Sequence, residues 1–367
     1  MIHHRRPSFR IAVAMAVGVG LLFGAAGLTR AQRAPEPAAG AIRHVHDPCL
    51  IKQGDAYYLF STGHGIPIRK SKDLVRWELV GRVFKEDLPT WAREEIPGSV
   101  FPWAPDIAYL NGRYHLYYSV SSFGKNRSLI ALATNKTLDP QSPDYAWKDE
   151  GKVFESHPGD DHNAIDSNVL LTKQSDRERL AFTFGSFWSG LKLIEMMPTT
   201  GKLPDSGAPV IRIASRPRPG AVEAPFLIER DGYHYLFVSF DFCCRGVRST
   251  YNIRVGRSKK LEGPYLDREG KSLLEEGGTP VLATKGREIG PGHCAVLREP
   301  GRDLLVYHFY DGMANGIPTL QIRPLSWDAD GWPTPGEPLV PLPDPGVKPD
   351  DAPARPDDGC AGCGSED

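Results

Sequence analysis

The chain has 367 residues and a formal net charge of −1; 40% of its residues are hydrophobic and 24% are charged. This composition is typical of a globular protein with a substantial core, and the length suits one large domain or two smaller ones. A chain without basic clusters is a poor candidate for binding nucleic acid or an anionic membrane.

Residues 1–31 show the order of segments found in a secretory signal peptide. Three arginines lie in MIHHRRPSFR, the apolar run IAVAMAVGVGLLFGAAGL follows, and the small residue Ala31 offers a cleavage site. An uncleaved membrane anchor is the alternative, because a run of 18 apolar residues nearly spans a bilayer. The Ala- and Gly-rich run favours cleavage, which removes four arginines and no acid and changes the formal charge from −1 to −5. We therefore expect a protein secreted to the periplasm or the outside of the cell.

Two segments of biased composition flank the central part of the chain. Residues 32–42 are predicted to be an Ala/Pro-rich linker, and residues 43–340 the folded domain. Residues 341–367 are rich in Pro, Asp and Gly without periodic apolar positions, which predicts a disordered tail. The tail holds a lone Cys-x-x-C pair, Cys360 and Cys363, for which export favours a disulfide over a metal site.

Five segments of similar pattern recur in the domain at intervals of about 60 residues. Each begins with an acidic residue or a histidine and continues as an apolar run, a polar turn and a second run with adjacent aromatic residues. The five opening residues are Asp47, Asp106, Asp166, Glu223 and His293. Strand-turn-strand units with almost no helical periodicity predict an all-β fold. A unit of this length repeated five times predicts a five-bladed β-propeller in a single domain.

The repeat also predicts where an active site lies. The first strand of each propeller blade lines the central channel, so the five opening residues are expected at equivalent positions around one pocket. Acids crowded around one axis raise the pKa of at least one of them. One acid and one base facing a sugar is the arrangement for hydrolysis of a glycosidic bond. Adjacent aromatic residues, in contrast, are expected to pack between blades.

Side-chain length and flanking residues favour an assignment of the two roles. Glu223 is one methylene longer than an aspartate and lies in the apolar sequence VEAPF, which favours its neutral form and a role as proton donor. Asp47 lies in the more polar sequence HDP and is the better base.

The chain resembles glycoside hydrolase family 43, and within it the endo-acting α-1,5-L-arabinanases. The matching segments include HDP (46–48), WAPDI (103–107), NAIDSN (163–168), FGSFWSGLKLI (184–194), EAPF (223–226), LFVSFDFCCRG (236–246) and GPGH (290–293). HDP and EAP are common to the wider family, whereas GSFWSG, FDFCCRG and GPGH look specific to arabinanases. The resemblance covers about residues 43–335. It implies a five-bladed propeller that hydrolyses internal linkages of arabinan, a side chain of pectin, with inversion.

The resemblance also implies roles for individual residues. Asp47 is the general base that activates water, Glu223 is the general acid, and Asp166 modulates the pKa of the acid and orients it. Asp106 matches a family motif without being one of these three acids, so a structural or sugar-binding role is expected. His293 is implied to reach a single, mostly water-coordinated metal ion at the channel centre, assigned as calcium. Relatives commonly carry a polar residue where this chain has Cys294.

Further residues are expected to line the same pocket and to contact the sugar, although its aromatic members could instead pack between blades. These candidates are Trp103, Asp106, Phe123, Gly124, Asn163, Ala164, Ile165, Ser186, Phe187 and Trp188. Trp188 is the strongest of them because it lies in an apparent loop containing Ser and Gly. The adjacent Cys243 and Cys244 form either a vicinal disulfide or two thiols, and both alternatives stay open.

Other functions remain as alternatives. An exo-acting arabinofuranosidase or a β-xylosidase can be built on the same fold, and a catalytically silent carbohydrate-binding propeller is disfavoured because all three acids are present. The expected partner is arabinan or an arabino-oligosaccharide. We expect a monomer that binds no nucleic acid and, after signal cleavage, no membrane.

Overall fold

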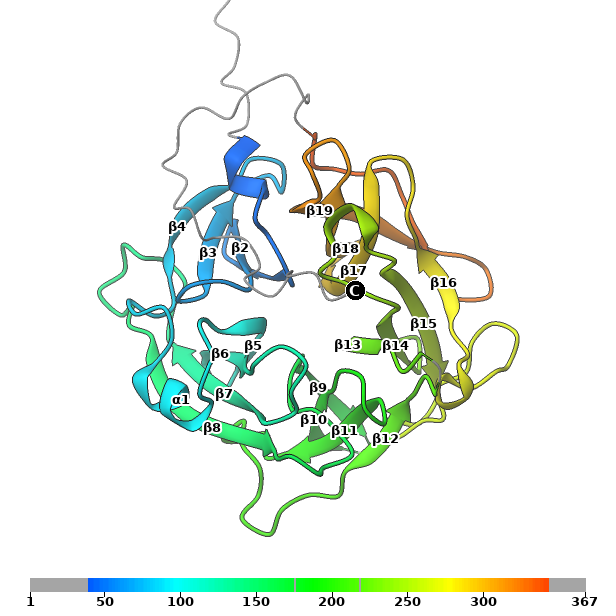
Figure 1. The fold of residues 1–367 in the computed structure, drawn as a ribbon, viewed down its shortest axis with the longest axis horizontal. Coiled ribbons are helices and arrows are strands. Elements are labelled where there is room, and N and C mark those ends of the chain that lie inside the picture. The colour runs from blue at the N-terminus through cyan, green and yellow to red at the C-terminus, as the bar shows by residue number, and fades with distance from the viewer. Residues whose placement is uncertain (1–38, 175, 218, 343–367) are drawn as a thin grey trace, which may run out of the picture. The chain divides into compact units, whose positions relative to one another are not determined.

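The computed structural model describes residues 39–342, apart from residues 175 and 218. Within this range the chain forms five four-stranded antiparallel sheets, each made of consecutive strands. The five sheets stand in a ring around a central axis (Figure 1), which is the predicted five-bladed β-propeller. No helix of the described residues has the length and apolar character needed to cross a membrane.

The sheets follow one another along the chain. The first contains β1 (Cys49–Gln53), β2 (Ala56–Phe60), β3 (Pro67–Ser71) and β4 (Glu78–Arg82). The second contains β5 (Trp103–Leu110), β6 (Arg113–Val120), β7 (Ser128–Asn135) and β8 (Lys148–Ser156). The third contains β9 (Asn168–Gln174), β10 (Arg177–Phe184), β11 (Leu191–Met196) and β12 (Ile211–Ala214).

The remaining two sheets have the same order. The fourth contains β13 (Val222–Arg230), β14 (Tyr233–Phe240), β15 (Asn252–Ser258) and β16 (Thr279–Leu282). The fifth contains β17 (Glu288–Glu299), β18 (Arg302–Asp311), β19 (Ile317–Trp327) and β20 (Pro333–Pro335). The 3-10 turn η1 (Ala39–Ile42) precedes β1, and three short helices lie between strands: α1 (Thr90–Glu95) and the 3-10 turns η2 (Gly246–Arg248) and η3 (Leu273–Glu275).

The adjacent aromatic residues of the sequence pack between sheets, as predicted. Successive side chains of a strand point to opposite faces, so neighbours in sequence contact different blades. In β2, Tyr57 packs between the first and fifth sheets, and Tyr58 packs between the first and second. In β6, Tyr118 faces the first sheet and Tyr117 faces the third. The core is therefore a set of layers between neighbouring blades.

Segments from both ends of the described chain close the ring. The amide of Val45 donates to the carbonyl of Pro318 at 3.2 Å, beside β19. The side chain of Gln321 in β19 bonds both backbone groups of Val340, at 3.0 and 3.1 Å. Val45 and Val340 are buried in the same apolar cluster between the first and fifth sheets.

The start of the packed domain differs from the predicted boundary. Helix η1 lies inside the segment 32–42 predicted as a linker, and its last residue, Ile42, is buried in the cluster that closes the ring. An apolar side chain at the end of an Ala/Pro-rich stretch gains free energy from this burial. The predicted signal peptide, residues 1–31, and the predicted tail beyond residue 342 lie outside the described residues.

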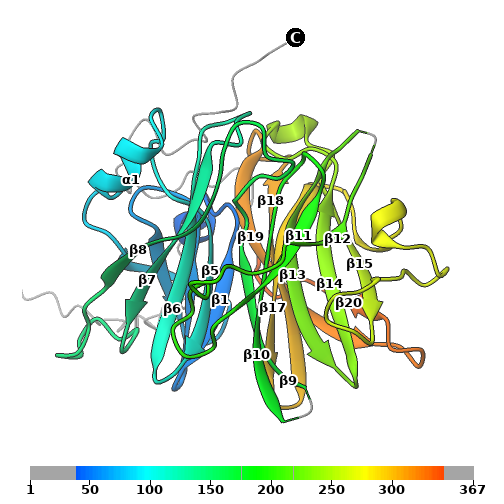
Figure 2. The same ribbon diagram turned by 90° about the horizontal axis from the view of Figure 1, so that it is seen from below.

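The innermost strands of the five sheets surround the axis and position the site. Strands β1, β5, β9, β13 and β17 each contact the innermost strands of the two neighbouring sheets. Figure 2 shows the strands from the side, running roughly along the axis. Because every sheet repeats the same up-and-down order, the starts of the innermost strands gather at one end of the ring. The loops that join the second and third strands of each sheet lie at that same end.

Candidate active site

Each innermost strand has one residue in the left-handed backbone region near its start. A non-glycine residue rarely adopts this conformation, which costs about 1–3 kcal/mol. The strand pairing also shifts register at these points in the second, fourth and fifth sheets. Such a bulge redirects the side chains beside it. The five residues are Asp47 (φ 51°), Ala104 (φ 44°), Asp166 (φ 58°), Ala224 (φ 53°) and His293 (φ 47°).

The five polar residues that open the repeats are therefore not structurally equivalent. Asp47, Asp166 and His293 occupy the left-handed position itself, whereas an alanine takes that place in the second and fourth sheets. Glu223 precedes this position by one residue, and Asp106 follows it by two. The equivalence expected from the sequence is wrong for these two residues, because a spacing of about 60 residues does not locate a bulge.

Asp47 is a buried carboxylate held by donors from several segments. Its Oδ1 lies 2.8 Å from Nδ1 of His46 and 3.0 Å from Nδ1 of His293. Its Oδ2 accepts a hydrogen bond from Oγ1 of Thr62 at 2.5 Å. Burial would raise the pKa of Asp47, but His46 and His293 together hold it well below its usual range. Asp47 is therefore ionised at neutral pH, as a general base must be.

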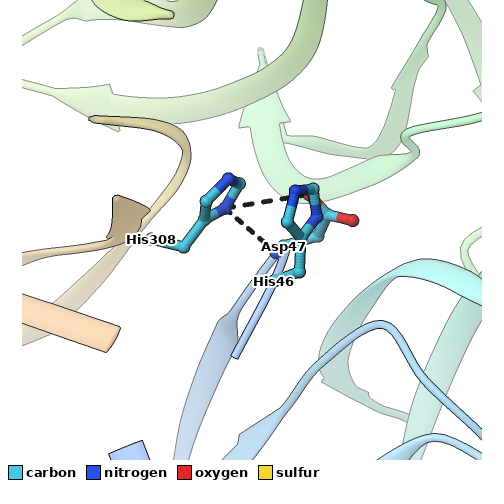
Figure 3. Close-up of side chains that lie close together, drawn as sticks. All are labelled: His46, Asp47 and His308. Atoms are coloured by element: carbon cyan, nitrogen blue, oxygen red, sulfur yellow. Dashed lines mark hydrogen bonds and ion pairs between the residues drawn. The ribbon is translucent and has the colours of Figure 1, made fainter. Parts of the chain in front are cut away.

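Two further histidine contacts orient Asp47 (Figure 3). The amide of Asp47 donates to Nδ1 of His308 at 3.1 Å, and His46 stacks on His308 with ring centroids 3.9 Å apart. Burial lowers the pKa of His308 well below its usual range, so its ring is neutral and accepts this bond. His46 is itself bonded to the hydroxyl of Tyr310 at 2.8 Å. His46, Asp47 and His308 each have an atom that could bind a metal ion, and these atoms lie within 4.8 Å of one another. The hydrogen bonds and ion pairs just described already involve all three residues.

Glu223 is buried and receives a hydroxyl donor on each carboxyl oxygen. Tyr251 donates to Oε1 at 2.7 Å, and Ser186 donates to Oε2 at 2.6 Å. Ser186 also forms an isolated β-bridge with Glu223, which ties the loop after β10 to the start of β13. The carboxyl group is therefore fixed in position by side chains from two sheets.

Asp166 lies against the residue that follows Glu223. Its Oδ2 accepts from the amide of Ala224 at 3.3 Å, and its own amide donates to Ser119 at 3.0 Å. Burial, together with the negative charges of Glu223 and Asp47, raises the pKa of Asp166 to about 8. Asp166 is therefore neutral at pH 7 while Asp47 is ionised, a separation of protonation states that suits acid–base chemistry.

His293 connects these groups electrostatically. Burial would lower its pKa, but Asp47, Asp166 and Glu223 raise the pKa of His293 to about 9. Its amide donates to Ser239 at 2.8 Å and its Nδ1 faces Asp47, so Nε2 is the ring nitrogen left for a metal, which it could bind only after losing the proton that the raised pKa keeps on the ring at pH 7. One nitrogen fits a calcium ion only if water supplies most of the oxygen ligands.

The predicted sugar contacts divide into exposed and buried residues. Trp188 and Phe123 are 42% and 64% exposed, on the loops after β10 and β6 at the end of the ring where the acids lie. Trp103 and Phe187 are partly exposed and Gly124 is exposed. Ser186 is buried but contacts Glu223. Asn163, Ala164 and Ile165 are buried in the approach to Asp166.

Asp106 is engaged in structural contacts with the third sheet. Its Oδ2 accepts from the amide of Val169 at 2.9 Å and from the side chain of Asn168 at 3.2 Å. Asn168 in turn accepts from the amide of Leu227 at 2.8 Å. These bonds join the innermost strands of the second, third and fourth sheets. Of the two roles expected for Asp106, the contacts favour the structural one.

Four residues of the site were not singled out from the sequence. Tyr251, Thr62, His308 and Tyr310 contact Glu223, Asp47 or His46 through their side chains. Three of them are aromatic or histidine residues near strands, and such residues are normally read as packing. The only local signal was the segment YHFYD, which contains both His308 and Tyr310.

Comparison with known proteins places the chain in a family. Glycosyl hydrolases family 43 matches residues 42–333 of the chain. The chain is 42% identical to an extracellular exo-α-(1→5)-L-arabinofuranosidase of Cellvibrio japonicus, over 79% of this chain and 85% of the relative. It is 43% identical to an extracellular endo-α-(1→5)-L-arabinanase of Bacillus subtilis, over 84% of this chain and 94% of the relative.

A solved structure shares the architecture. The α-L-arabinanase of Cellvibrio cellulosa, complexed with arabinohexaose, is 41% identical and superimposes with a TM-score of 0.75. The match covers 80% of this chain and 95% of the other.

Proposed function

The chain belongs to glycosyl hydrolases family 43, and on that premise we propose that it hydrolyses internal α-1,5-L-arabinofuranosidic linkages of arabinan with inversion. One observation carries the proposal: Asp47 is held ionised and Asp166 is held neutral beside Glu223, at the starts of three different innermost strands. The endo-acting relative of Bacillus subtilis and the arabinohexaose complex support the substrate class.

The reaction follows from the environments of the three acids. Asp47 takes a proton from a water molecule; contacts from His46, His293 and Thr62 hold its carboxylate oriented for this step, and its backbone amide is held by His308. Glu223 gives a proton to the leaving oxygen. Asp166, neutral at pH 7, stands beside Glu223, where the amide of Ala224 holds its carboxyl group. An inverting enzyme needs about 6.5–9.5 Å between base and acid to admit the water.

Digestion of debranched linear arabinan, with products sized by chromatography, tests the proposal. An endo enzyme releases a range of oligosaccharides in the first minutes, and Asp47→Asn and Glu223→Gln variants lose this activity by about 10²- to 10⁴-fold. Release of a single small product from the outset would show that the enzyme acts from the chain end (exo) and not on internal linkages (endo). The exo-acting relative of Cellvibrio japonicus makes that the second candidate.

We further propose that His293 contributes one ligand to a hydrated calcium ion. Support comes from its place among three carboxyl groups and from Nε2, which faces away from the contact with Asp47 and would bind the ion in exchange for its proton. When bound, the ion supplies positive charge close to the acids. Calorimetric titration of chelator-treated protein with calcium tests this, and a His293→Ala variant should show no binding heat. Equal binding by both proteins would refute the assignment.

Export is part of the same proposal. Two relatives are described as extracellular, and the N-terminal residues 1–31 have the pattern of a signal peptide. Sequencing the N-terminus of the secreted protein should give Gln32 as the first residue. A protein that keeps residues 1–31 would contradict cleavage.

A further inference from the structure

Tyr251 is a buried residue behind the carboxyl group of Glu223. It precedes β15 directly, is 1% exposed, and donates its hydroxyl to Oε1 of Glu223 at 2.7 Å. Ser186 holds the other oxygen, Oε2, from the loop that carries the exposed Trp188. The two oxygens of Glu223 therefore have different surroundings. Oε1 faces a buried phenol, and Oε2 faces a loop of the exposed end of the ring.

The ring of Tyr251 fits its place because the facing residue is a glycine. A Cβ atom at Gly292, in β17, would lie 1.9 Å from Cδ1 and 2.2 Å from Cε1 of Tyr251. Every larger residue at position 292 would displace the phenol. The fourth and fifth sheets thus combine to bring one hydroxyl to Oε1.

The phenol stays a donor across the working pH range. Burial, reinforced by the negative charges of Glu223 and of nearby Cys243 and Asp166, holds the pKa of Tyr251 well above its usual range. Glu223 accepts a hydrogen bond from Tyr251, but Tyr251 keeps its proton at neutral pH. The contact is therefore a fixed hydrogen bond and not a proton relay.

We propose that Tyr251 is a positioning residue for the general acid, which pins Oε1 of Glu223 so that the acidic proton is carried and delivered by Oε2. This inference rests on the proposed role of Glu223. Both oxygens accept a hydroxyl bond, but Oε1 faces the fully buried phenol of Tyr251, whereas Oε2 lies on the side of Ser186 and the loop of exposed Trp188, where a leaving oxygen can approach. Ser186 is a hydroxyl and can rotate from donating to Oε2 to accepting from it.

The contact favours the transition state over the ground state. As the Oε2–H bond breaks and the proton moves to the leaving oxygen, negative charge develops on the Glu223 carboxyl group. A hydrogen bond to a charged acceptor is about twice as strong as one to a neutral acceptor. The bond from Tyr251 therefore strengthens during proton transfer, and interactions of this kind raise kcat more than they lower KM.

The Tyr251→Phe variant tests the proposal, because it removes one hydroxyl and keeps the ring. Two substrates are compared: linear arabinan, whose sugar leaving group needs a proton, and a nitrophenyl arabino-oligoside, whose nitrophenolate leaves without one. We expect kcat on arabinan to fall about 10- to 100-fold with little change in KM. We expect the rate on the nitrophenyl substrate to change less than about threefold.

Tyr307→Phe is the matched control. Tyr307 is also fully buried and donates to a buried carboxylate, Oε2 of Glu288 at 2.8 Å, outside the group of catalytic acids. This variant should lower the melting temperature without a selective loss on arabinan. Gly292→Ala breaks the same contact in a second way, because it keeps the hydroxyl of Tyr251 but displaces the ring that carries it. This variant should show the same selective loss of activity on arabinan.

The outcomes distinguish a failure of the role proposed for Tyr251 from a failure of the proposed function. Equal losses on both substrates, or full activity of Tyr251→Phe on arabinan, would overturn the positioning role. A wild-type protein that does not cleave linear arabinan would overturn the proposed function instead. A selective loss shared by Tyr251→Phe and Gly292→Ala, and absent from Tyr307→Phe, supports the assignment of Oε2 as the donor oxygen.

Discussion

His293 and Asp47, from the fifth and the first sheet, meet as an ion pair with Nδ1 3.0 Å from Oδ1. The pair joins the last and the first blade at the axis of the ring. It also places one positive charge among three buried carboxyl groups, which explains how the site tolerates their proximity. The orientation of the proposed base thus depends on correct closure of the propeller.

The ion pair predicts a pH dependence of stability. The pKa of histidine in an unfolded chain is about 6.5, and that of His293 in the folded protein is about 9. Its contribution is fully present below the unfolded value and is lost as the pH rises through about 9. The melting temperature should therefore fall between neutral pH and about pH 9, with a smaller fall in His293→Gln. An exposed control, His157→Gln, should keep the wild-type dependence; an unchanged slope in His293→Gln would contradict the prediction.

Asp166 predicts the alkaline limb of the activity profile. Its raised pKa keeps it neutral below about pH 8, and deprotonation above this value places a negative charge beside Glu223 that opposes the charge developing on Glu223 as it gives up its proton. We expect kcat/KM on linear arabinan to fall as the pH rises through about 8. Asp166→Asn stays neutral at every pH, so its lower activity should not show this fall. A variant whose profile matches the wild type above pH 7 would disprove the assignment.

The loop that presents Trp188 depends on a buried lysine. Nζ of Lys192, which is 1% exposed, donates to Oγ of Ser189 at 2.6 Å, and Ser189 donates to Oδ2 of Asp161 at 2.7 Å. Lys192→Met should loosen the loop and raise KM for arabinan about 2- to 10-fold, which corresponds to an aromatic contact of about 0.5–1.5 kcal/mol. Initial-rate kinetics check this, with kcat nearly unchanged.

Lys173→Met provides the control for this loop. Lys173 has a 63% exposed side chain on the third sheet and pairs only with exposed Asp176 among the interactions described. It should leave KM unchanged. Equal kinetics of Lys192→Met and wild type would show that Trp188 does not need this support.

The contacts of Asp106 predict that replacing this residue lowers stability without lowering the affinity for substrate. Asp106→Ala leaves the amide of Val169 and the side chain of Asn168 without their acceptor in a buried position. An unsatisfied buried donor costs about 1–3 kcal/mol, which urea denaturation can measure. KM for arabinan should stay at the wild-type value. Exposed Asp144→Ala is the control, and a raised KM in Asp106→Ala would instead favour the sugar-binding role.

The amino-acid sequence by itself determined the architecture. Alternation with period two marks strands locally, and five repeats of about 60 residues leave few arrangements other than a ring of five sheets. The segments HDP, NAIDSN and EAPF also marked Asp47, Asp166 and Glu223, because these residues lie at the ends of strands whose pattern is visible in the sequence.

Only the tertiary structure decided how the opening residues are used. Asp106 and Glu223 both open a repeat in the sequence, yet a left-handed residue at each strand start places one in a structural contact and the other beside Ser186 and Tyr251. Spacing cannot reveal such a bulge, because it moves the register by only one or two residues. Tyr251 and His308 reach the acids across 28 and 261 positions of sequence. The first contact forms when the fourth sheet folds and the second only when the fifth sheet closes on the first, so no local pattern encodes them.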